Sequence, residues 1–365
     1  MSISKIPSAG ISNAVNFKNI IINGDMSIAQ RGTSTTSISS GATYHTVDRW
    51  NTQLVSAGTW TQSQETDVPT GQGFAKSLKM DCTTANGSLS ATSYLVVQGR
   101  FEGQNLQYLK KGTANAQSLT LSFWVKSNKT GTYAAEIRDT DNSRHISKTY
   151  TINSADTWEK KTITYAGDTT GAFDNDNAQS LRLLFWLVAG TDYSSGTLAT
   201  SWQSQTHTGD AVGNVNLADS TDNEWYITGV QLEAGTSASD FEFLPYDVNL
   251  QRCQRYFYKL IDVPGGDATG YFATGYMYSA TRLYFQIPFF VEMRAIPTLS
   301  AASGTDYYTF YRDSAGDSFN TILGTSLRSK SAMLRADDTH ISGTAGQAGG
   351  IHTSSSSVVE FDSEL

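Results

Sequence analysis

Short stretches in which apolar and polar residues alternate constrain the fold of this chain more than any other feature. Residues 118–127 (SLTLSFWVKS) place Leu119, Leu121, Phe123 and Val125 on one side of an extended strand. Other segments that read as strands are 157–165, 181–188 (apolar on both sides) and 224–233. Clusters of Gly, Asn and Asp separate them, as turns require. This pattern predicts an all-β fold of antiparallel strands.

The composition agrees with a sheet protein of two domains. Only 16% of the 365 residues are charged and 11% are aromatic, which suits aromatic side chains buried in sheets beneath neutral polar ones. One segment, 247–260 (DVNLQRCQRYFYKL), fits either a helix capped by Asp247 or an extended strand. We expect a polar lead segment at 1–18, a large β-sandwich domain at 19–246 and a smaller β domain at 247–365.

Charge and cysteine content argue against several classes of protein. The formal net charge is −8 and the sequence has no basic stripe, so no nucleic-acid partner is expected. Cys82 and Cys253 are too far apart to form a disulfide framework or a zinc motif, which suits assembly in a reducing cytoplasm. No segment approaches the roughly 18 consecutive apolar residues of a membrane span, and 1–17 lacks the apolar run of a signal peptide.

The polar residues show no catalytic or metal-binding motif. Two acidic stretches, 139–143 and 174–177, fit turns better than metal loops, because Asp and Asn bond their own backbone. The histidines lack metal-ligand spacing and are interpreted as surface or loop residues: His45, His145, His207, His340 and His352. No nucleophile elbow or phosphate-binding loop is present. We therefore expect no enzymatic activity, with a glycosidase as the alternative that remains open.

Two local patterns resemble a known family. They are NIIINGDMSIAQRG followed by YHTVDRW (19–32 and 44–50), and GVQLEAGTSASDFEFLPYDVNLQRCQRYFY (229–258). Together they resemble the opening and closing segments of a jelly-roll domain in phage structural proteins of the tail-fibre type. The resemblance implies a jelly-roll β-sandwich followed by a smaller, sandwich-like β domain at the distal tip. It also implies a homotrimer and a location on the phage particle, on the tail rather than the head.

In such a particle the lead segment 1–18 would attach the chain to another phage structural protein. Its apolar residues are the candidate anchors: Ile3, Ile6, Pro7 and Ile11. The C-terminal domain would then contact the host.

The same two patterns are also similar to those of jelly-roll carbohydrate-binding modules. Many such modules hold a structural calcium through an acidic side chain of the last strand, but Gly229 stands at that position here. Asp25 could supply one oxygen, and calcium needs six to eight. We expect no cofactor and no metal, and a structural calcium remains the open alternative.

The aromatic residues are the candidates for glycan or receptor contact. Trp124, Trp186 and Trp225 lie within strand patterns and are expected in the core. The candidate contact residues lie in polar, Gly- and Ser-rich stretches or in the run YYTFY, and they are Trp60, Tyr193, Trp202, Tyr307 and Tyr311. In the run YYTFY, alternation predicts that Tyr307 and Tyr311 share one face. The alternative interpretation is that these aromatic side chains pack against the sandwich and hold loops to it.

The function expected is that of a tail fibre or adhesin that attaches to a host surface glycan or receptor. A capsid fibre or decoration protein is the first alternative, and a glycan-depolymerising enzyme is the second.

Overall fold

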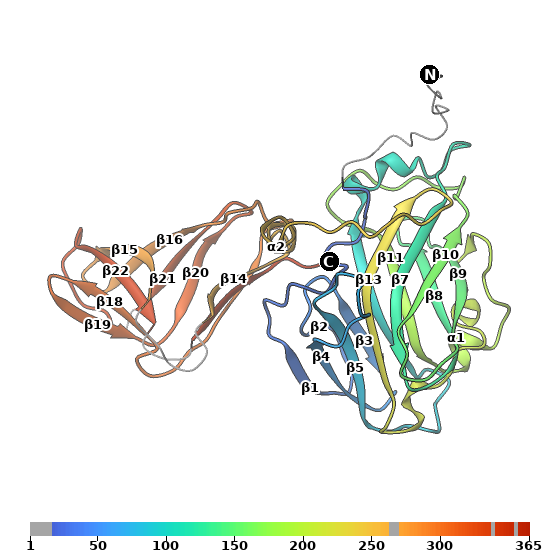
Figure 1. Ribbon diagram of the computed structural model, residues 1–365. Helices are drawn as coiled ribbons and strands as arrows, with labels where there is room; N and C mark the ends of the chain where they lie inside the picture. Colours follow the sequence, from blue (N-terminus) through green and yellow to red (C-terminus); the bar gives the residue numbers. More distant parts are fainter. Residues whose placement is uncertain (1–16, 263–269, 337–339, 354–356) are drawn as a thin grey trace, which may run out of the picture. The chain divides into compact units, whose positions relative to one another are not determined.

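The chain folds into two compact units, each built almost wholly of antiparallel strands. The computed structural model describes residues 17–262, 270–336, 340–353 and 357–365 (Figure 1). The units are Met1–Leu244 and Pro245–Leu365. The expected boundary after residue 246 falls in the first turn of helix α2 (Tyr246–Gln254). The candidate anchors Ile3, Ile6, Pro7 and Ile11 lie outside the described residues.

The larger unit is a jelly-roll sandwich of two sheets (Figure 1). The first sheet contains, in spatial order, β1 (Ser34–Ile38), β4 (Thr59–Glu65), β5 (Ser77–Thr84), β13 (Glu224–Ala234), β7 (Leu119–Ser127) and β10 (Glu159–Tyr165). The second contains β12 (Gln203–Ser204), β9 (Arg144–Ile152), β8 (Gly131–Asp139), β11 (Gln179–Ala189), β6 (Tyr94–Glu102), β3 (Asn51–Val55) and β2 (Gly41–Tyr44). The predicted all-β, antiparallel fold is confirmed.

Short helical turns join these strands. They are η2 (Gly103–Asn105), η3 (Gln107–Leu109), α1 (Thr191–Ser194), η4 (His207–Gly209) and η5 (Leu217–Asp219). No helix in the described part of the chain is long and apolar enough to cross a membrane.

Strand β11 shows how the alternation of side chains builds the core. Leu181, Leu183 and Phe185 point inward and join the main apolar cluster between the two sheets. The intervening Leu184 and Trp186 belong to a separate small cluster on the outward side of the second sheet. Because successive side chains of a strand point to opposite sides, this strand is apolar on both, as the sequence predicted.

The smaller unit begins with the segment for which the sequence allowed either a helix or a strand. Both occur in succession, as helix α2 and strand β14 (Phe257–Asp262). The prediction that Asp247 caps the helix is wrong: Pro245 is the N-cap residue and no side chain caps it. Asp247 lies in the first turn, where a negative charge suits the helix dipole.

Two sheets pack around the core of the smaller unit. One contains β14, β23 (Val358–Asp362) and β17 (Thr298–Ala301). The other contains, in spatial order, β19 (Ala315–Phe319), β18 (Tyr308–Arg312), β22 (Ala348–Thr353), β15 (Tyr271–Ser279), β16 (Arg282–Pro288), β21 (Ser331–Ala336) and β20 (Ile322–Leu327). Both sheets contribute to one cluster, in which Phe361, Tyr308 and Phe310 are fully buried. This confirms the predicted smaller β domain.

Gly229 of β13 has a structural role that explains why no acidic residue stands there. Its backbone is left-handed, with φ +61°, at an irregularity in the pairing of β13 with β7. A Cβ atom at this position would lie 2.5 Å from the ring of Phe74. That ring packs against Phe241 and Phe243, each with 5.1 Å between centroids, so it cannot move aside freely.

We predict that Gly229→Ala destabilises the larger unit more than Gly213→Ala does. Both glycines have positive φ, but a Cβ at Gly213 would meet nothing within 4 Å. The shared backbone strain costs roughly 1–2 kcal/mol, and crowding against Phe74 adds about 1–3 kcal/mol. All seven tryptophans lie in the larger unit, so denaturation followed by tryptophan fluorescence reports on that unit. Equal losses in the two variants would contradict the packing argument.

Candidate functional site

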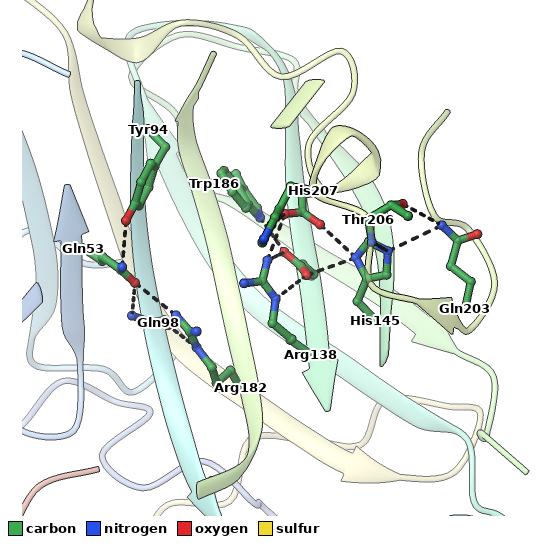
Figure 2. A network of polar contacts seen from close by, with 12 residues as sticks. Gln53, Tyr94, Gln98, Arg138, His145, Arg182, Trp186, Gln203, Thr206 and His207 are labelled. Atoms are coloured by element: carbon green, nitrogen blue, oxygen red, sulfur yellow. Dashed lines mark hydrogen bonds and ion pairs between the residues drawn. The ribbon is translucent and has the colours of Figure 1, made fainter. Parts of the chain in front are cut away.

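The outward side of the second sheet, here called the outer face, carries a network of polar side chains (Figure 2). Cross-strand pairing places Arg100 of β6, Arg182 of β11, Arg138 of β8 and His145 of β9 side by side. Gln203 of β12 continues the row. This outer face has a half closed by buried ion pairs and a half open to solvent.

Four buried side chains form the closed half, here called the charged cluster: Glu136, Arg138, His145 and Asp210. Arg138 donates from Nε and Nη2 to the two oxygens of Glu136, at 2.8 and 3.0 Å. Its Nη2 also donates to Oδ2 of Asp210 at 3.0 Å. His145 Nδ1 lies 2.9 Å from Asp210 Oδ1 and 3.3 Å from Glu136 Oε1. Two acidic and two basic groups therefore satisfy one another.

The pKa values of the cluster follow from burial and these contacts. Burial alone would raise the pKa of Glu136, but Arg138 and His145 outweigh it and lower the pKa to about 2. Burial would lower the pKa of His145, but Asp210 and Glu136 outweigh it and raise the pKa to about 9. Burial, with the charge of Glu136, raises the pKa of Asp210 despite its bond to His145. Glu136 is therefore the more readily ionised carboxyl group.

Three of these residues offer ligand atoms that could surround a metal ion. The atoms of Glu136, His145 and Asp210 lie within 4.8 Å of one another. The guanidinium of Arg138 already contacts both carboxylates, however, and supplies the positive charge that a cation would bring. The arrangement fits an internal ion-pair cluster better than a metal centre.

The open half of the outer face consists of partly exposed Gln53, Tyr94 and Arg182 around buried Gln98. Arg182 donates from Nε to Oε1 of Gln98 at 2.8 Å and from Nη2 to Oε1 of Gln53 at 3.1 Å. Gln53 Nε2 donates to the hydroxyl oxygen of Tyr94 at 2.7 Å (Figure 2). Gln98 Nε2 donates to Asn51 Oδ1 at 2.9 Å. These bonds fix the orientation of each group while leaving part of it accessible.

An aromatic group borders the open half. Tyr94 lies 5.0 Å from Tyr193 and 6.2 Å from Trp186 between ring centroids. The indole N–H of Trp186 donates to Glu136 at 3.0 Å and so joins the aromatic group to the charged cluster. Of the five aromatic candidates, Tyr193 is the one that the structure brings to this site, and it is partly exposed there.

The other tryptophan candidates lie elsewhere. The prediction that Trp60 is an exposed contact residue is wrong, because its ring is 0% exposed in the main core and its N–H donates to Ala57. Trp202 is partly buried against that core, donates to Ala166 at 2.7 Å and faces the ammonium of Lys111. The prediction that Trp225 lies in the core is confirmed. The same prediction for Trp124 is wrong, because its side chain is partly exposed.

The two tyrosine candidates of the smaller unit have different surroundings. Tyr311 is 41% exposed on β18 and its ring stacks on His352 at 4.7 Å, with Tyr271 nearby. Tyr307 precedes that strand and packs against the core of the unit. The prediction that Tyr307 and Tyr311 share one face of a strand is wrong, because Tyr307 lies outside strand β18.

The charged cluster was missed at the level of sequence. His145, interpreted as a surface or loop residue, is fully buried on β9. The interpretation of 139–143 as a turn holds, since Asn142 N–H donates to Asp139 at 3.1 Å, but Asp139 also forms a buried ion pair with Lys111. The alternation of charged Glu136 and Arg138 along one strand was the signal in the sequence that could have indicated this cluster. Their partner Asp210 lies 72 residues from Arg138, so the sequence did not indicate the pairing.

We predict that His145 makes stability depend on pH. A histidine whose pKa is raised in the folded state stabilises it fully below its unfolded value near 6.5, and the contribution is lost as pH rises toward 9. The advantage of the wild type over His145→Gln should therefore shrink between pH 6 and 9, by on the order of 1 kcal/mol. His207→Gln is the control, because that side chain contacts the same Asp210 but is 60% exposed. A difference independent of pH would contradict this prediction.

Comparison with known proteins finds no matching family and no matching curated protein. Among solved structures, an enzymatically active domain of tailspike protein 4 from bacteriophage CBA120 matches with 14% identity and a TM-score of 0.31. That match covers 60% of this chain and 22% of the tailspike chain.

Two carbohydrate-binding modules also match. A family 11 module from Clostridium thermocellum has 10% identity and a TM-score of 0.29, over 57% of this chain and 99% of its own. A family 29 module complexed with mannohexaose has 12% identity and a TM-score of 0.26, over 59% and 99%. Likeness at this level identifies no function.

Proposed function

We propose that this chain is a non-catalytic attachment protein of a phage particle, and that its outer face binds a glycan of the host surface. The observation that carries the glycan part is the open half, where Gln53, Tyr94 and Arg182 are held in place yet remain partly exposed. Amide, hydroxyl and guanidinium groups match the alternating donors and acceptors of sugar hydroxyls. The ring of Tyr94 offers an apolar surface beside them.

The position of these groups on strands supports binding. Gln53, Gln98 and Arg182 come from three neighbouring strands, β3, β6 and β11, whose ladder hydrogen bonds fix the spacing between them. A site built on strands loses little conformational freedom when a ligand binds. A preorganised polar face suits the hydroxyl groups of an oligosaccharide.

The carboxylates of the outer face support a non-catalytic role. Hydrolysis of a glycosidic bond needs two carboxyl groups that flank the sugar, roughly 5 to 10 Å apart. Glu136 and Asp210 are fully buried and bound to Arg138 and His145, so neither reaches a ligand on the surface. This supports the proposal that the outer face binds a glycan without using Glu136 or Asp210 as a general acid or nucleophile.

The assignment to a phage particle rests on the sequence patterns at 19–50 and 229–258. The same patterns underlie our proposals of a homotrimer, of attachment to another phage protein through 1–18, and of a separate contact with a host receptor through the smaller unit. Placement on the tail makes the chain an adhesin, whereas placement on the head makes it a capsid fibre with the same glycan chemistry.

We predict that Gln53→Ala weakens glycan binding at least tenfold. The substitution removes an amide that we propose contacts the sugar, and it also removes the hydrogen-bond partner of Tyr94 and one of the two acceptors of Arg182. Gln286→Ala is the matched control, because Gln286 is an exposed strand residue of the smaller unit. Binding of the full-length proteins to an oligosaccharide array gives the comparison. Equal binding by both variants would remove the outer face from the proposal, and no binding by the wild type would reject glycan recognition.

We predict that a gold-labelled antibody against the smaller unit decorates the tail tips of intact particles in electron micrographs. Label spread over the head would contradict the adhesin proposal and favour a capsid fibre. Particles without label would contradict the structural role in the virion.

A further inference from the structure

Arg182 of the outer face donates its hydrogen bonds to the neutral amides of Gln98 and Gln53. Cross-strand pairing sets it directly between Arg100 on β6 and Arg138 on β11's other neighbour, β8. Like charges at directly opposed positions of a sheet destabilise it. Burial, followed by repulsion from Arg138 and Arg100, lowers the pKa of Arg182 to about 10. The fold thus holds a guanidinium where its positive charge is disfavoured.

The charge of Glu136 offsets only part of this repulsion, because burial and the two neighbouring arginines outweigh it. Glu136 and Asp210 bind Arg138, whereas Arg182 contacts the amide oxygens of Gln53 and Gln98. No acidic side chain among the described residues forms an ion pair with Arg182, and its Nη1 makes no hydrogen bond to them. A neutral amide orients a guanidinium without cancelling its charge, so Arg182 can still attract an anion.

We propose that Arg182 is the subsite for the carboxylate of an acidic sugar, such as a uronic acid, within the glycan that the outer face binds. The inference rests on the proposed function. A guanidinium pairs with a carboxylate through parallel hydrogen bonds, and this pairing is stronger and more directional than one with a neutral group.

The surroundings favour a sugar carboxylate over a polyanion. Gln53 and Tyr94 beside Arg182 are neutral, which suits the hydroxyl groups of the same sugar. The formal net charge of −8 would repel an extended polyanion such as a nucleic acid. Arg182 is partly exposed beside these neutral groups, which fits one carboxylate within an otherwise neutral stretch of glycan.

The test measures binding of the full-length protein to pairs of oligosaccharides. Within a pair, one member carries carboxylate groups where the other carries hydroxymethyl groups, as in trimers of galacturonic acid and of galactose. We expect the wild type to bind acidic members of a panel at least tenfold more tightly than their neutral partners at low salt. Arg182→Gln should lose this preference, so that it binds the acidic and the neutral partner with equal affinity. Arg328→Gln, which removes an exposed charge in the smaller unit, should behave as the wild type.

Several outcomes would overturn the inference. Equal wild-type binding of acidic and neutral partners rejects the carboxylate subsite but leaves the proposed function intact, whereas binding of neither class rejects both. Competition by free acetate or sulfate as strong as that by the acidic sugar would reject a sugar-specific subsite.

Stability gives a second readout that needs no ligand. Because Arg182 is repelled by its neighbours, Arg182→Gln should have an unfolding temperature equal to or above that of the wild type. A clear fall would show that Arg182 is a structural residue and would contradict the inference. Arg182→Lys should keep the charge but lose part of the acidic preference, because an ammonium cannot pair bidentately.

Discussion

The burial of the inward side of strand β11 is the constraint on which the rest of the larger unit depends. Leu181, Leu183 and Phe185 are packed between the two sheets, which fixes the register of this central strand. A shift by one residue would turn every side chain to the opposite side. The same packing that builds the core therefore forces Arg182 and Trp186 onto the outer face.

The cross-strand pairing places the acidic partners of the outer face next to Arg138 rather than next to Arg182. Glu136 is opposite Leu184 and next but one to Arg138 on β8, so it binds Arg138 and leaves Arg182 with amide partners. Asp210, from the segment that covers this half, completes the burial of the charged cluster. The buried ion pairs thus lie in the closed half, and the partly exposed groups that we propose bind a glycan lie in the open half.

The strands could be predicted from the sequence, whereas the site could not. Residues 118–127 and 181–188 alternate or run apolar in ways that only a sandwich strand explains, and β7 and β11 follow them closely. The site joins Gln53 to Arg182 across 129 residues, and that proximity depends on strand order, which alternation does not specify. Trp60 was misplaced for a related reason: its neighbours Thr59 and Thr61 are polar and partly exposed, while its own ring points into the core.

The most direct test of the central claim is a crystal structure of the full-length protein with an acidic oligosaccharide bound. The account predicts sugar density on the outer face, with a carboxylate against Arg182 and hydroxyl groups against Gln53 and Tyr94. Sugar bound instead at the exposed Tyr271 and Tyr311 of the smaller unit would contradict it. In that case the polar groups of the outer face would have a structural role alone.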